Sequence, residues 1–187
     1  DARVLSSLKS ERVRSSKILR GPSGRTSIED RRKLVKDVHD ALLASKVCAD
    51  ALGMALIASA SKANDWQIEL SEMARIWKGG CIIRARFLDT IMRAYQGGKQ
   101  LDNLLLADAV RETIDGAQIP WRRIVGLAAS RGIPMPATMA SLSYYDSYRI
   151  ANLPQNLTQA QRDAFGAHTY RRKDEPSGAP IHTEWLS

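Results

Sequence analysis

Apolar and charged positions alternate at helical spacing from the first residues of the chain. Over residues 2–19 the apolar side chains recur every three to five positions, as one face of a helix requires: Val4, Leu5, Leu8, Val13, Ile18 and Leu19. Gly21 and Pro22 follow directly and end the pattern. The sequence therefore predicts a helix over 2–19 and a break after it.

The longest uninterrupted pattern covers residues 28–63, which contain no proline and only one glycine, Gly53. Ser27 is expected to cap this helix, with Glu29 and Asp30 placed favourably in its first turn. At 1.5 Å per residue such a helix is about 50 Å long. Its many alanines and serines allow neighbouring helices to approach closely, so we expect it to form the central helix of a bundle.

Shorter helical patterns follow over 70–77, 81–95, 102–115, 121–131 and 137–150. Two prolines hold residues 132–136 extended, and a capping-box pattern over 158–161 opens a last short helix that Gly166 closes. Residues 171–181 have the composition of a surface loop, and no hairpin is expected. The predicted fold is all-α, a helical bundle around one long helix (1–157) followed by an extended C-terminal segment (158–187).

Composition and charge narrow the function classes. Apolar residues make up 44% of the chain and aromatic residues only 6%, which favours packed helices and excludes a disordered chain. Of the net charge of +8, residues 1–36 carry +7, from eleven Lys or Arg and four acids. A basic surface of this kind suits nucleic acid, an anionic small ligand, or a solvated face whose acidic partner lies elsewhere.

The remaining composition points to a protein of the cytoplasm. Cys48 and Cys81 form no pair motif and are expected to be buried and reduced, and the three histidines show no metal-ligand spacing with them. No uninterrupted apolar run reaches the roughly 20 residues of a membrane span, so no membrane contact is expected. No signal peptide is evident, and because the first residue is Asp1 we expect a fragment or a trimmed product rather than a natural start.

Several motifs occur in the order known for one enzyme family. The chain resembles the C-terminal part of 6-phosphogluconate dehydrogenases over its whole length, in the shorter bacterial form. The resemblance is carried by the segments 5–9, 44–46, 77–84, 121–123, 132–136, 142–149, 159–170 and 182–187.

The resemblance implies an NADP-dependent oxidative decarboxylation of 6-phosphogluconate to ribulose 5-phosphate, a step of the pentose phosphate pathway. It implies a homodimer in which each active site borrows residues from the partner's C-terminal segment, and it implies no metal. The family's Rossmann domain and its Gly-x-Gly-x-x-Gly turn are missing from this sequence. The family's catalytic lysine and glutamate also lie upstream of it, so the chain alone is expected to be inactive.

Three residues match substrate-binding positions of the family. Arg3 and Arg162 match arginines that bind the substrate phosphate, the second donated across the dimer, and His168 matches a donated histidine that holds the sugar phosphate. Guanidinium is always charged, and its planar fork of donors fits phosphate oxygens bidentately. A helix would fix the direction of Arg162, and a glycine turn would aim the ring of His168 outward.

Two other classes of function stay open from the residues themselves. The basic composition is compatible with a helical nucleic-acid-binding module, although the basic residues lack interleaved aromatics and a helix-turn-helix spacing. The chain is also compatible with a purely structural dimerisation module without ligand affinity. In either case Arg162 is a surface charge and His168 a hydrogen-bonded structural residue.

Overall fold

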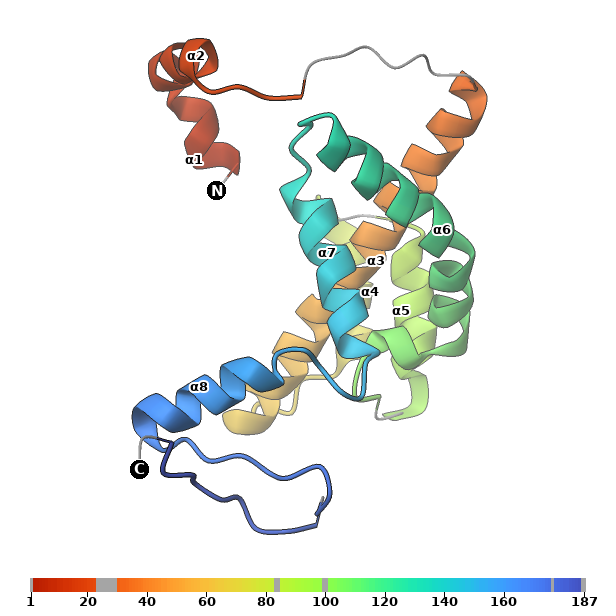
Figure 1. Ribbon diagram of the computed structural model, residues 1–187. Coiled ribbons are helices and arrows are strands. Elements are labelled where there is room, and N and C mark those ends of the chain that lie inside the picture. The colour runs from red at the N-terminus through yellow and green to blue at the C-terminus, as the bar shows by residue number, and fades with distance from the viewer. Residues whose placement is uncertain (1, 23–29, 83–84, 99–100, 176, 186–187) are drawn as a thin grey trace. The chain divides into compact units, whose positions relative to one another are not determined.

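The computed structural model describes residues 2–22, 30–82, 85–98, 101–175 and 177–185, and within them it contains helices and no strand (Figure 1). This confirms the predicted all-α class. The elements in chain order are α1 (Ala2–Ser7), α2 (Lys9–Ile18), α3 (Arg31–Ala63), α4 (Leu70–Gly80), α5 (Phe87–Tyr95), η1 (Gln96–Gly98), η2 (Leu104–Leu106), α6 (Asp108–Ser130), α7 (Pro136–Tyr148) and α8 (Asn156–Gly166).

The chain divides into two compact units, Asp1–Tyr145 and Asp146–Ser187, and each is described by itself. The first unit holds α1 to α6 and most of α7, and the second holds α8 and the C-terminal loop. The functional boundary expected after residue 157 stays a prediction.

Helix α3 is the long helix that the sequence predicts, with 33 residues. Its N-cap is Asp30, whose side chain accepts a hydrogen bond of 2.9 Å from the backbone N–H of Lys33. The expected cap Ser27 and the expected first residue Ile28 lie outside the described residues. Asp30 therefore supplies the cap where we expected it only to favour the first turn.

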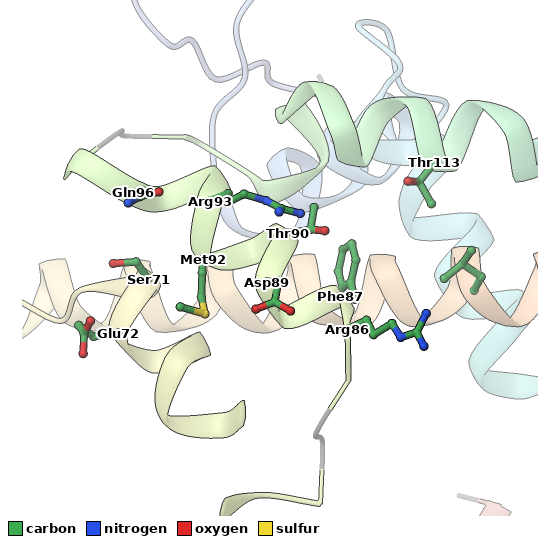
Figure 2. Close-up of a pocket in the computed structure, with 11 residues that line it drawn as sticks. Ser71, Glu72, Arg86, Phe87, Asp89, Thr90, Met92, Arg93, Gln96 and Thr113 are labelled. Carbon is green, nitrogen blue, oxygen red and sulfur yellow. The ribbon is translucent and has the colours of Figure 1, made fainter. Parts of the chain in front are cut away.

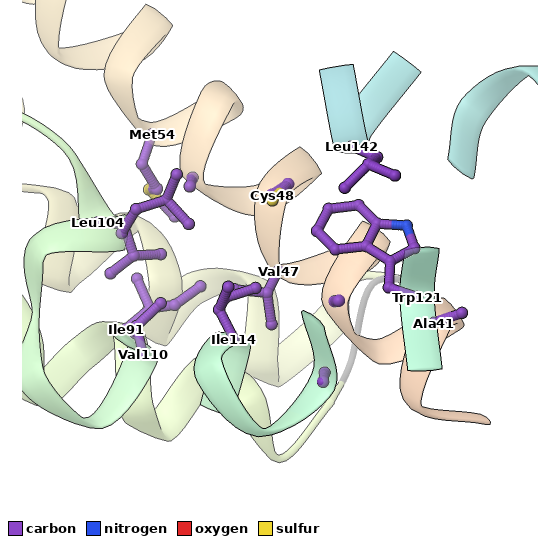
Figure 3. Packing of buried hydrophobic residues seen from close by; sticks show 14 of the residues in the cluster. Ala41, Val47, Cys48, Met54, Ile91, Leu104, Val110, Ile114, Trp121 and Leu142 are labelled. Atoms are coloured by element: carbon purple, nitrogen blue, oxygen red, sulfur yellow. The ribbon is translucent and has the colours of Figure 1, made fainter. Parts of the chain in front are cut away.

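The hydrophobic core of the first unit surrounds α3. Helix α6 packs along α3, and α4 packs against α5 (Figure 1). Figure 3 shows side chains of α3, α5, α6, α7 and η2 meeting in this core, with the ring of Trp121 6.1 Å from that of Tyr145. The largest fully buried apolar side chains are Trp121, Met54, Leu88, Ile91, Leu104, Ile114, Val47 and Val110. Burial of this apolar surface is the main source of stability in the unit.

A buried carboxylate joins α3 to α6. Asp37 is 5% exposed and accepts hydrogen bonds from Arg123 (2.5 Å) on α6 and from Lys33 (3.0 Å) one turn earlier on α3. Burial by itself raises the pKa of Asp37, but the two cationic donors outweigh it and hold that pKa below its usual range. Asp37 thus stays charged and fixes the register of the two helices.

The structure corrects two predicted helices. The helix expected over 2–19 is broken at Leu8 into α1 and α2, and Arg12 donates to the carbonyls of Leu5 (2.9 Å) and Ser6 (3.1 Å) at the end of α1. The helix expected over 81–95 begins only at Phe87. Helix α4, expected to end at residue 77, continues to Gly80. The glycine pair Gly79–Gly80 lowers helix propensity without forbidding the helix.

A third correction concerns α6. The patterns over 102–115 and 121–131 were expected to be separate helices, but α6 runs from Asp108 to Ser130 through Pro120. Its buried positions continue in phase on both sides of the proline, from Ile114 through Ala117 and Trp121 to Ile124. Packing of this face on α3 therefore outweighs the missing N–H of the proline.

By length and composition, α3 is also the one helix among the described residues that is long and apolar enough to cross a membrane, with a mean hydropathy of 1.7 in its best window. This is weak support for a membrane span, since a core helix passes the same test. Lys46 and Asp50 interrupt the apolar run, and one face of α3 is buried in the protein core.

Candidate functional site

The two C-terminal candidate residues lie at the end of α8. This helix begins at Asn156, with Gln155 at the N-cap and no side-chain cap, so the capping box expected at Thr158 is wrong. Thr158 lies inside the first turn, because the chain enters the helix directly after Pro154. Helix α8 ends at Gly166, as predicted.

Arg162 lies on α8, and His168 lies in the turn that follows it. Arg162 is exposed, and its guanidinium donates to the side-chain oxygen of Gln159, one turn earlier on the helix, at 3.1 Å. Gly166 lies four residues on from Arg162, one turn along the same face of α8. The exposed imidazole of His168 covers this glycine, since a Cβ there would lie only 3.1 Å from its Nε2 atom. The structure therefore places the imidazole beyond Arg162, over the end of the same helix.

The turn that carries His168 differs from the expected glycine turn. Its left-handed residues are Ala167 (φ 50°) and Thr169 (φ 59°), on either side of His168, while Gly166 is the last helical residue. Left-handed backbone costs a residue with a Cβ roughly 1–2 kcal/mol. Gly166 serves a different purpose, because the absence of a Cβ leaves room for the imidazole.

Asp163 holds this strained turn, and sequence reasoning missed it. Its carboxylate is fully buried and accepts four hydrogen bonds, two at each oxygen. Oδ1 accepts from the backbone N–H of Thr169 (2.8 Å) and lies 3.1 Å from Nδ1 of His182. Oδ2 accepts from the backbone N–H of Thr183 (3.0 Å) and from Nε1 of Trp185 (2.9 Å). The four donors close the C-terminal loop onto α8.

Burial alone raises the pKa of the Asp163 carboxyl, but the four donated hydrogen bonds outweigh it and hold that pKa well below its usual range. A carboxylate only accepts, so the proton of His182 lies on Nδ1. No sequence signal marks Asp163, because its donors lie six to 22 residues downstream. His182 is one of these donors.

The ends of the loop are also tied to each other. Tyr170 and Ile181 form an isolated antiparallel bridge through both backbone hydrogen bonds (3.0 and 2.9 Å), and the hydroxyls of Tyr170 and Thr183 lie 2.6 Å apart. This pairing was not expected, since residues 171–181 read only as a loop. It gives the loop a fixed base directly after the candidate histidine.

Arg3 belongs to the other unit. It lies on α1, its side chain is exposed, and its backbone carbonyl accepts a hydrogen bond of 2.7 Å from the hydroxyl of Ser6. The structure therefore groups Arg162 with His168 and describes Arg3 within the first unit only.

Two open hollows of similar size lie apart from these side chains. One, of about 720 Å³, lies over α4 and α5 (Figure 2), and its lining includes two carboxylates, Glu72 and Asp89, and two guanidinium groups, Arg86 and Arg93. The other, of about 730 Å³, lies between α8 and the C-terminal loop and is lined by Gln159, Tyr170 and Trp185 among others. Neither of these two hollows is lined by Arg162 or His168.

The cysteines and metal-ligand types form no further site. Cys48 is buried, as expected, and burial raises the pKa of its thiol to about 12, whereas Cys81 is only half-buried. In the described part of the chain no three His, Cys, Asp or Glu side chains are grouped so that they could hold a metal ion. The expectation that no metal is used stays a prediction.

Comparison with known proteins decides the family. The model of the 6-phosphogluconate dehydrogenase C-terminal domain matches residues 1–185. The chain belongs to the 6-phosphogluconate dehydrogenase family. It is 55% identical over 186 residues to the decarboxylating 6-phosphogluconate dehydrogenase of Synechococcus elongatus, and 49% identical over 186 residues to one from Oryza sativa. The match covers the whole of this chain in both cases, and 39% and 38% of those relatives' lengths.

A solved structure agrees with this assignment. The chain superposes on Plasmodium falciparum 6-phosphogluconate dehydrogenase with a TM-score of 0.88 at 39% identity, over 99% of this chain and 39% of that one. The Plasmodium enzyme is described in its apo form, with its cofactor NADP⁺ and with its substrate 6-phosphogluconate. The chain thus spans about two fifths of the length of a 6-phosphogluconate dehydrogenase.

Proposed function

We propose that this chain is the C-terminal portion of an NADP-dependent, decarboxylating 6-phosphogluconate dehydrogenase and that it supplies groups that bind the substrate phosphate. The observation that supports this most directly is that Arg162 on α8 and His168 over the end of the same helix are both exposed. A guanidinium fork and an imidazole N–H can contact different oxygens of one phosphorylated sugar acid. Arg3 is the third proposed contact, from α1.

The site is proposed to be shared between two copies of the chain. In the second unit Leu157 and Phe165 are 70% and 88% exposed on α8, which is unusual for large apolar side chains unless a partner covers them. The hollow found between α8 and the C-terminal loop is lined by neither Arg162 nor His168. A homodimer in which α8 lies against the partner subunit accounts for both features.

The residues of this chain do not fit the main binding site for NADP. A dinucleotide is held by a glycine-rich turn between a strand and a helix, and the described residues contain no strand. We therefore assign no step of hydride transfer or decarboxylation to this chain. Its proposed part is to orient the substrate for catalytic groups elsewhere in the full-length protein, which also leaves the isolated chain inactive.

The nucleic-acid alternative is weakened by the pairing of the basic residues. On α3, three lysines form ion pairs with acids four residues on: Lys33 with Asp37, Lys36 with Asp40, and Lys46 with Asp50. A phosphate backbone would have to compete with these carboxylates. A cytoplasmic location also stays a prediction, since relatives from Arabidopsis thaliana include chloroplastic proteins.

Substitution of Arg162 in the full-length protein tests the proposal. Arg162→Ala removes a charge-assisted contact, so we expect the KM for 6-phosphogluconate to rise about tenfold or more while the KM for NADP is unchanged. Arg162→Lys should recover only part of the loss, because the planar fork is absent. Arg171→Ala is the matched control, an exposed arginine of the same unit that donates to the backbone carbonyl of Gly178.

Mixed dimers test whether the site is shared. One parent lacks the upstream catalytic lysine and the other carries Arg162→Ala, and both are assayed at low substrate concentration. If Arg162 acts across the interface, each mixed dimer has one site with both lesions and one intact site, so activity returns to about half of wild type per mixed dimer. Mixed dimers that form without regaining activity would contradict the shared site.

A further inference from the structure

The turn around His168 has an unusual backbone conformation. The residues on either side of His168, Ala167 and Thr169, are both left-handed and both carry a Cβ, so they store strain that the surrounding contacts must offset. Both of their backbone N–H groups are bound by one residue. The N–H of Ala167 donates to the carbonyl of Asp163 at 2.8 Å, and the N–H of Thr169 donates to its carboxylate at 2.8 Å.

The other contacts of the turn lead back to the same helix. The side-chain amide of Gln159 donates to the carbonyl of Thr169 at 2.6 Å, one turn before Asp163. His168 itself is exposed, and no other residue that the structure describes forms a hydrogen bond with its ring. Its position over Gly166 is therefore set by the backbone on either side of it.

Arg162 and His168 depend on Asp163 to different degrees. Arg162 lies within α8, whose backbone hydrogen bonds hold it whatever happens at the end of the helix. His168 lies beyond the helix, in the turn that the Asp163 carboxylate holds. Loss of that carboxylate would release the histidine and leave the arginine in place.

We propose that Asp163 is a positioning residue for substrate binding: its buried carboxylate anchors the 167–185 loop on α8 and thereby holds His168 over the end of α8. The inference rests on the proposed substrate-binding role of His168 and goes beyond it by naming the group that makes this role possible. Both carboxylate oxygens are needed. An amide at residue 163 would turn its NH₂ group toward one of the two donor pairs and leave those donors unpaired.

The test is a double-mutant cycle in the full-length enzyme, read out as KM for 6-phosphogluconate and for NADP. We expect Asp163→Asn to raise the KM for 6-phosphogluconate as much as His168→Ala does, about tenfold, with the KM for NADP unchanged. The double variant Asp163→Asn/His168→Ala should be no worse than His168→Ala, because the same contact is lost once. Asp163→Asn/Arg162→Ala should show the product of the two single effects.

A matched control and a milder variant keep the test decisive. Asp174→Asn removes an exposed carboxylate of the same unit, paired with Arg172, and should leave both KM values unchanged. If Asp163→Asn does not yield folded dimer, Trp185→Phe removes only one of the four donors and keeps an aromatic ring. It should raise the KM for 6-phosphogluconate about two- to threefold, again without any further effect in the His168→Ala background.

The outcomes separate the two proposals. A folded Asp163→Asn or Trp185→Phe enzyme whose effect multiplies with that of His168→Ala has lost stability or another contact, and the positioning role is wrong. A folded Asp163→Asn enzyme with unchanged KM, beside an impaired His168→Ala enzyme, also overturns the positioning role and leaves the proposed function intact. An unimpaired His168→Ala enzyme overturns both the role of His168 and its positioning by Asp163.

Discussion

The two units of this chain are held together by different forces. In the first, a cluster of aliphatic and aromatic side chains is fully buried around α3. In the second, Asp163 is the single buried residue among those the structure describes, and large apolar side chains such as Phe165 are exposed. The first unit is stabilised by area removed from water and the second by directed hydrogen bonds on one carboxylate.

This difference has a consequence for function. Apolar burial is non-directional and tolerates small shifts, whereas four hydrogen bonds on one carboxylate specify the position of each donor. The second unit carries the two side chains that we propose bind the substrate, and a mode of stabilisation that fixes geometry suits that role. It also makes this unit dependent on a single ionised group.

The largest expected effect is a loss of stability in the core of the first unit. Leu88 is fully buried on α5, so Leu88→Ala should destabilise the bundle by about 2–5 kcal/mol. Leu52→Ala on α3 is the matched control, because Leu52 is 51% exposed and its truncation should cost no more than about 0.5 kcal/mol. Native-state hydrogen exchange of peptides from α5 and α6 in the full-length protein measures both free energies.

A cost below about 1 kcal/mol for Leu88→Ala would contradict the proposed core. A large cost for Leu52→Ala would instead show that the rest of the full-length protein covers this face of α3.

Low pH should destabilise the second unit before it destabilises the first. The pKa of Asp163 is lower in the folded chain than the roughly 3.9 of an unfolded aspartate, so its contribution is present above that value and is lost as the pH falls toward the folded pKa. Burial of the apolar core does not titrate, and Asp37, whose pKa is also lowered, supplies only one contact between α3 and α6 beside that core. Below about pH 4 we therefore expect the 167–185 loop to open before α6 does.

Hydrogen exchange between about pH 6 and pH 3, corrected for the intrinsic exchange rate, measures this difference. In Asp163→Asn the loop should already be open at neutral pH and should show no further transition on acidification. Simultaneous opening of the loop and α6 in the unsubstituted protein would refute the contrast between the two units.

The smallest effect tests geometry without loss of stability. Gly166→Ala adds a methyl group 3.1 Å from Nε2 of His168, so the ring must shift by a few tenths of an ångström, while α8 gains up to about 1 kcal/mol of helix propensity. We expect the KM for 6-phosphogluconate to rise about threefold with no loss of thermal stability. Gln161→Ala, at an exposed position of the same helix, should change neither KM nor stability appreciably.

An unchanged KM in Gly166→Ala would mean that the ring of His168 has room to move without loss of binding. The position of His168 over the end of α8 would then not matter for substrate binding.

Much of the fold could be predicted from the sequence, because helical periodicity is a local property. The pattern over 28–63 predicted α3, and the glycine and proline positions predicted the ends of α7 and α8 to within a few residues. The ordered motifs also indicated the family, and they named Arg162 and His168. Each of these inferences depends on residues that are close together in the sequence.

What only the tertiary structure decided depends on residues that are far apart. Helix α6 continues through Pro120 because its buried face packs on α3. The energy of this packing cannot be read from the residues around the proline alone. Asp163 looks like an ordinary helix-surface acid until Thr169, Thr183 and Trp185 return to it from the loop. Burial of a carboxylate is strongly unfavourable unless several hydrogen-bond donors surround it, and these donors come together only once the chain is folded.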